Sequence, residues 1–109
     1  MNFYIGNKIS DIKVEERNAI FTDDMSSYIY KLRNKVDMDM SVLYKIDPYS
    51  DVELSLDTVK EIVKICRYLL DNDLMSGFED EYAIEDLENV ISIGEDAIRE
   101  GKGLVSIGD

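Results

Sequence analysis

Acidic side chains are the residues of this sequence that could do chemistry, because the usual catalytic groups are missing. The chain has 24 Asp and Glu residues, no histidine and a single cysteine, Cys66. Without histidine there is no imidazole base, no Ser-His or Cys-His nucleophile pair and no imidazole metal site. Cys66 lies on the apolar stripe of a predicted helix, which favours a buried core residue over a reactive thiol.

Carboxylate chemistry remains formally open, but no pattern supports it. Acid–base catalysis needs two carboxyls in different environments of one cleft, and the sequence shows no such pair. The segment 71–77 begins like a calcium loop, yet Met75 and Ser76 stand where an oxygen ligand and a glycine are required. Gly101-Lys102-Gly103 lacks the spacing of a phosphate-binding loop. We therefore predict no catalytic residue, no metal site and no cofactor.

The excess of negative charge lies in the second half of the chain. Residues 1–46 carry seven basic and seven acidic side chains, whereas residues 47–109 carry five and seventeen, which accounts for the net charge of -12. Nucleic acids and anionic membranes bind basic surfaces, so we expect neither as a partner. A basic protein partner is favoured, because opposite fields steer association. The alternative is that the acidity only keeps a small protein in solution.

The strongest interface candidate is the segment 78–82, where two aromatic residues flank three consecutive acids. Its residues are Phe78, Glu79, Asp80, Glu81 and Tyr82. Aromatic residues are frequent interface hot spots, and desolvated carboxylates hold lysine and arginine strongly. Stabilising the start of a following helix is the alternative role. The turn residues Asp47, Tyr49 and Asp51 are a second candidate, although they also fit a plain surface turn. Four further acids would extend the negative electrostatic field around the segment 78–82, namely Asp71, Asp73, Glu85 and Glu88.

Periodicity predicts the elements that position these segments. Apolar residues at helical spacing predict helices over about 23–35, 56–71 and 83–100, the last burying a face from Ile84 to Ile98. Strands are predicted over 3–5, 40–46 and 104–107, with an extended segment over 8–14. Ser55 is the expected N-cap of the second helix, and Gly101 the C′ residue of the third. We expect one α+β domain over 1–109, with about three helices on a small, mostly antiparallel sheet.

Three segments carry a resemblance to a known class of proteins: Tyr4–Lys8, Ile46–Asp51 and Ala97–Asp109. Together they are similar to small bacterial immunity proteins of contact-dependent inhibition and related polymorphic toxin systems. The resemblance implies a non-catalytic antidote that binds one cognate toxin, often a basic nuclease. It also fits the cytoplasm, which the single cysteine and the lack of a signal or a long apolar run favour. A nucleic-acid mimic, a carboxylate enzyme and an adaptor or oligomerisation domain remain open.

Overall fold

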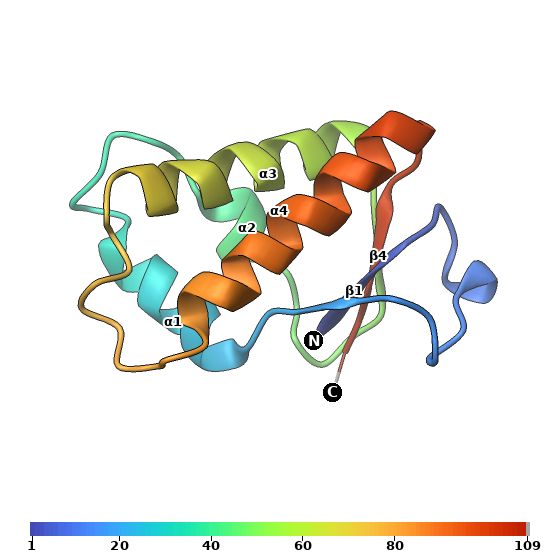
Figure 1. Ribbon diagram of the computed structural model, residues 1–109, viewed down its shortest axis with the longest axis horizontal. Coiled ribbons are helices and arrows are strands. Elements are labelled where there is room, and N and C mark those ends of the chain that lie inside the picture. The colour runs from blue at the N-terminus through green and yellow to red at the C-terminus, as the bar shows by residue number, and fades with distance from the viewer. Residues whose placement is uncertain (109) are drawn as a thin grey trace.

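The two ends of the chain form the centre of the sheet (Figure 1). The computed structural model describes residues 1–108, and the four strands of that range run antiparallel in the order β2-β1-β4-β3. Their bounds are β1 (Asn2–Ile5), β2 (Ala19–Ile20), β3 (Val52–Leu54) and β4 (Leu104–Ile107). Phe3 lies opposite Ser106, and Leu54 opposite Leu104. The predicted terminal strands and the α+β class are thus confirmed, and the structure shows in addition that these two strands are neighbours.

Helices cover one face and one end of this sheet. They are α1 (Asp23–Leu32), α2 (Ser41–Tyr44), α3 (Leu56–Asp71) and α4 (Ala83–Glu100). The two longest, α3 and α4, pack side by side, while α1 and α2 lie at the end away from the strands (Figure 1). The caps explain the bounds of α3 and α4. The Ser55 hydroxyl accepts a hydrogen bond from the Thr58 N–H, and Gly101 ends α4 at a φ of 67°.

The predicted strand over 40–46 is wrong, because most of this segment forms the short helix α2. Met40, Leu43 and Ile46 are the buried residues, and their spacing of three places them on one helical face. Val42 is only half-buried, although a strand would bury it together with Met40. The middle strand is instead β3, which follows the turn at Pro48.

The segment 8–14, which was predicted to be extended, instead belongs to an irregular stretch over residues 6–18. It contains a single 3-10 turn, η1 (Ile9–Asp11), and folds over the sheet face that carries Tyr4 and Val105. The Tyr4 hydroxyl donates to the Val14 carbonyl at 3.1 Å. Ile12 packs so closely on Gly6 that a Cβ there would lie 2.9 Å from the Ile12 Cδ1. This cover explains how Tyr4 and Val105 are buried on the face opposite the helices.

The main core lies between the helices and the inner sheet face. Cys66 is fully buried there, and burial raises the pKa of its thiol to about 12, in agreement with the predicted structural role. The buried residues of α4 are Ala83, Leu87, Val90, Ile91, Ile93, Gly94 and Ala97. Ile84 is 53% exposed, so its predicted place in the core is wrong. It follows Ala83 by one residue, which turns it about 100° away from that buried residue. No helix within residues 1–108 has the length and apolar character to cross a membrane.

Candidate functional site

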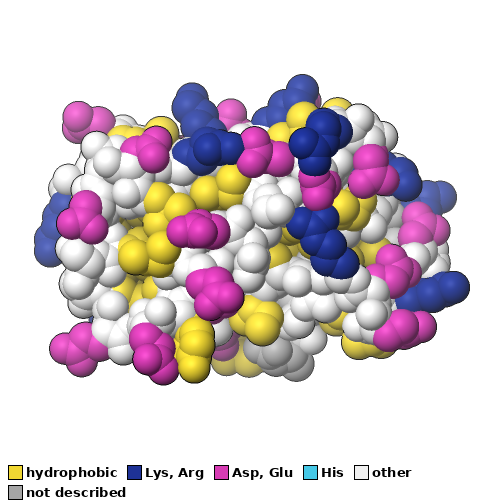
Figure 2. All heavy atoms as spheres, in the orientation of Figure 1, with side chains coloured by type: hydrophobic (Ala, Val, Ile, Leu, Met, Phe, Trp, Pro, Cys, Tyr) yellow, Lys and Arg dark blue, Asp and Glu magenta, His cyan; other side chains and the backbone are white. Residues whose placement is uncertain are grey.

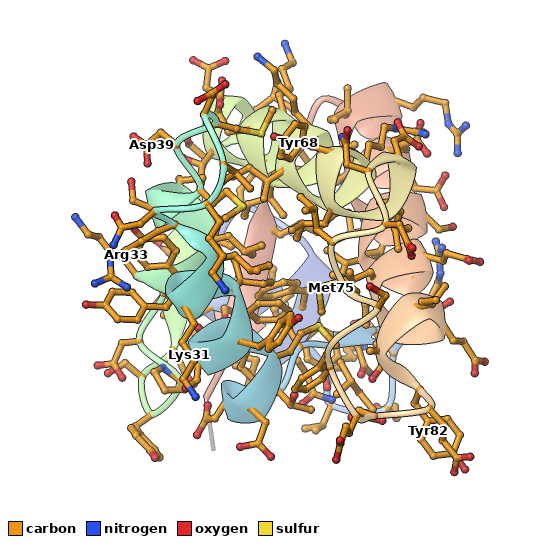
Figure 3. The ribbon with its side chains drawn as sticks, turned by 90° about the vertical axis from the view of Figure 1, so that its left-hand side faces the viewer. Lys31, Arg33, Asp39, Tyr68, Met75 and Tyr82 are labelled. Carbon is orange, nitrogen blue, oxygen red and sulfur yellow. The ribbon has the colours of Figure 1, made fainter. Side chains whose placement is uncertain are left out.

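A surface hollow of about 790 Å³ lies between α1 and the segment 78–82, and we call it the acidic hollow. Helix α1 contributes Asp24, Ser27, Tyr28 and Lys31, and the segment contributes Phe78, Glu79, Asp80, Glu81 and Tyr82. Figure 3 shows Lys31 on the side of α1 and Tyr82 at the outer end of the segment, pointing away from the protein. All five residues of the strongest sequence candidate therefore line one concave surface.

Apolar contacts hold the loop between α3 and α4 against α1. Met75 belongs to this loop and is only 4% exposed, and Figure 3 shows it on the inner side of the loop, toward the middle of the molecule. The rings of Tyr28 and Phe78 are in contact, with centroids 5.1 Å apart. Gly77 approaches the same tyrosine so closely that a Cβ there would lie 2.6 Å from the Tyr28 hydroxyl oxygen. These contacts place the acids beside α1 and give the hollow an aromatic wall.

The acids of the hollow divide into one with a structural role and others that face solvent. Asp80 accepts a hydrogen bond from the Tyr82 N–H at 2.9 Å, and its carbonyl accepts from the Ala83 N–H. Asp80 thus organises the start of α4, as the alternative interpretation predicted. Glu79 and Glu81 are exposed and form no hydrogen bond or ion pair within residues 1–108. Both carboxylates are available to a cationic partner.

The surface around the hollow is acidic and partly apolar. Figure 2 shows acidic side chains interspersed with hydrophobic ones at the lower left, over the start of α4, whereas Lys and Arg lie mainly along the upper and right edges. Tyr82 and Ile84 are both more than half exposed in this region. Aromatic and aliphatic groups within a field of one sign are typical of a surface that binds a charged protein.

The environment of Asp86, beside the hollow, leads to a prediction about the stability of the protein. Burial, and then the negative charges of Asp80 and Glu85, raise the pKa of Asp86 above its ordinary value of 3.8. The folded state therefore holds this proton more tightly than the unfolded state, and stability falls as pH rises through the two pKa values. We expect Asp86→Asn to raise the free energy of unfolding by a few tenths of a kcal/mol at pH 7.

Urea unfolding at two pH values measures this effect. The gain should vanish at about pH 3, where the aspartate is already protonated in both states. Asp57→Asn is the matched control, since it removes a carboxylate from the first turn of α3. Both residues lie in the first turn of a helix, where an acid is stabilising, but only at Asp86 do burial and the charges of Asp80 and Glu85 oppose this effect. The control should therefore bring no gain at pH 7. Equal gains in both variants would contradict the crowding at Asp86.

The second sequence candidate, the turn 47–51, holds its own acids in structural roles. The Asp47 carboxylate accepts hydrogen bonds from the Tyr49 N–H at 2.9 Å and the Ser50 hydroxyl at 2.8 Å, and these bonds lower the pKa of Asp47. The Asp51 carboxylate accepts from the Gly108 N–H at 3.0 Å. Tyr49 remains 72% exposed. Of the three candidate residues of this turn, the two acids thus accept hydrogen bonds within the protein, and Tyr49 has a largely exposed side chain.

Asp71 and Glu88 belong to a different surface. They line a hollow of about 370 Å³ between α3 and α4, together with Arg67 and Arg99. Ion pairs neutralise much of this groove, namely Arg67–Glu95, Arg17–Asp96 and Arg99–Asp96. Asp73 and Glu85 are exposed but line neither hollow. The acidic residues predicted to form one surface therefore lie on more than one. Those of the segment 78–82 line the acidic hollow beside α1, whereas Asp71 and Glu88 line the other groove.

Sequence reasoning missed the contribution of α1. Asp24, Tyr28 and Lys31 lie on the same side of the helix as the loop, although about 50 positions separate them from it in the chain. One sequence signal could have indicated that α1 contributes acids to the site. This signal is the pair Asp23-Asp24 in its first turn, which precedes the basic Lys31 in its last turn. Comparison with protein-family models, curated proteins and solved structures gives no match.

Proposed function

We propose that this chain is a non-catalytic immunity protein that binds and neutralises one basic toxin domain, in the first instance a nuclease. The observation that carries the proposal is the acidic hollow, in which four carboxylates surround an aromatic wall and a single lysine. Such a surface complements a basic protein in charge and offers apolar area for tight binding. The resemblance of three sequence segments to immunity proteins gives the class.

The physical logic of inhibition is competition for a basic surface. A nuclease binds the phosphate backbone through lysine and arginine side chains. Glu79 and Glu81 are positioned to pair with such side chains, while Phe78 and Tyr82 supply apolar contact at either end of the acidic run. A protein that covers these cations blocks the substrate without any chemistry of its own. We place this action in the cytoplasm, where an incoming toxin would meet its substrate.

The test is a titration with the cognate toxin domain, used in a catalytically inactive form. We expect a one-to-one complex with a Kd on the order of 1 nM at low salt. Affinity should fall as salt rises, since the screening length shrinks from about 10 Å at 0.1 M to about 3 Å at 1 M. Active toxin should be inhibited, and unrelated nucleases should not. Inhibition of many nucleases alike would contradict the proposal and favour a nucleic-acid mimic.

A further inference from the structure

A second hollow lies on the other side of the first half of α1, and we call it the tyrosine hollow. It has a volume of about 310 Å³ and is lined by Asp23, Ser26, Ser27, Tyr44, Ile46, Pro48 and Tyr49. Ser27 lines both this hollow and the acidic hollow. The two interface segments chosen from the sequence, 47–51 and 78–82, therefore flank the same two turns of one helix.

Asp23 contributes a carboxylate to the tyrosine hollow, and it also lines a neighbouring hollow beside Met1 and Thr22. This residue is half-buried at the first position of α1, and its Oδ1 atom is buried without a hydrogen-bond partner within residues 1–108. A carboxylate oxygen removed from water without a donor is unfavourable. A cation seated in the hollow would pair with the carboxylate that lines it. The hollow therefore carries a negative group of its own, separate from the exposed acids at 78–82.

The aromatic residues indicate which cation fits. Arg33 already places its guanidinium 3.7 Å from the ring centroid of Tyr30. Tyr30 in turn contacts Tyr44 edge to face, with centroids 5.2 Å apart, and Tyr44 lines the hollow. Tyr49 offers a further, largely exposed ring. Arg33 on Tyr30 is thus an example, beside the hollow, of a guanidinium stacked on a tyrosine ring. The tyrosines of the hollow could hold a second guanidinium, from a partner, in the same way.

We propose that the tyrosine hollow receives an arginine side chain of the basic partner, paired with Asp23 and stacked against tyrosine. This inference rests on the proposed function and makes α1 the centre of a two-hollow interface. Arginine is the chosen occupant because its planar guanidinium both stacks on aromatic rings and donates to a carboxylate in fixed geometry. A lysine ammonium is a compact, strongly hydrated charge that gains less from such a site.

The test is an NMR titration of the ¹⁵N-labelled full chain with blocked hexa-arginine and hexa-lysine peptides as probes. Hexa-arginine should shift the amides of 23–27 and 44–50, with an affinity about threefold above that of hexa-lysine. Asp23→Asn should remove this preference at 44–50, and the exposed Tyr49→Leu should do the same without removing a charge. Asp57→Asn, in the corresponding turn of α3, is the control and should leave the preference intact.

The outcomes separate this inference from the proposed function. Shifts at 78–82 without shifts at 44–50, or equal affinity for the two peptides at 44–50, would overturn the arginine site while leaving the acidic hollow standing. An unchanged preference in both Asp23→Asn and Tyr49→Leu would also overturn it. The absence of shifts in both hollows would count against the proposed function as well.

Discussion

Reversing the charges of Glu79, Asp80 and Glu81 to lysine is expected to weaken binding of the toxin domain by about 100-fold or more. The substitution replaces three attractive charges in the acidic hollow by three that repel the same basic surface. Like charges placed opposite each other across an interface cost several kcal/mol, so the loss should exceed that of simple neutralisation. Isothermal titration at about 0.1 M salt, where screening is moderate, gives the ratio of affinities.

The control for this variant carries the same change in net charge elsewhere. Asp11, Glu15 and Glu61 are exposed acids outside both hollows, and their joint reversal to lysine should change the affinity only a few-fold. Because Asp80 organises the start of α4, a second variant reverses only Glu79 and Glu81. A folded triple variant with unchanged affinity, or equal losses in the triple variant and its control, would contradict binding through the acidic hollow.

Gly103→Ala is expected to lower the free energy of unfolding by about 3 kcal/mol, at the upper end of the usual cost of overpacking. A Cβ at this position would lie 2.0 Å from the Leu54 carbonyl oxygen and 3.2 Å from its carbon. These are backbone atoms of the neighbouring strand β3, so no side-chain rotation can relieve the clash. The pairing of Leu54 with Leu104 would have to open. Urea denaturation monitored by circular dichroism gives the change in stability.

Gly101→Ala is the matched control, because it adds the same methyl group two residues earlier. No atom lies within 4 Å of a Cβ at Gly101, but its φ of 67° is in the left-handed region. The expected cost is therefore only the backbone strain of about 1 kcal/mol. A larger loss for Gly101→Ala than for Gly103→Ala would contradict the close approach of β3 and β4.

The long helices were predictable from sequence because periodicity and caps agree. Ser55 begins α3 through a local hydrogen bond and Gly101 ends α4 through its backbone conformation, and a short window of sequence contains both signals. The structure of segment 40–46 was not predictable in this way. Its apolar residues fit both the alternation of a strand and the spacing of three that is typical of a helix. Only packing decides between them, and it buries Met40, Leu43 and Ile46. Strands as short as β2 and β3 carry too few residues for a pattern.

The candidate site was predictable in its composition but not in its assembly. Three acids between two aromatics identify 78–82 without any structure. That α1 forms the other wall depends on the contact between Tyr28 and Phe78, which joins residues 50 positions apart. The charge of the sequence also could not distinguish Asp71 and Glu88 from the acids of the acidic hollow. The fold places these two residues in a groove that they share with arginines. Charge along the sequence indicates the sign of a partner, and the fold decides which acids meet it.

Amide hydrogen exchange of the full chain, free and bound to the inactive toxin domain, tests the central claim most directly. Binding through the acidic hollow predicts slower exchange in the bound state over 23–31 and 78–83, and the arginine inference adds 44–50. The groove between α3 and α4, around Glu88 to Arg99, should exchange at the same rate in both states. Protection of that groove, or of the segment 6–18, with unchanged exchange at 78–83 would contradict binding through the acidic hollow.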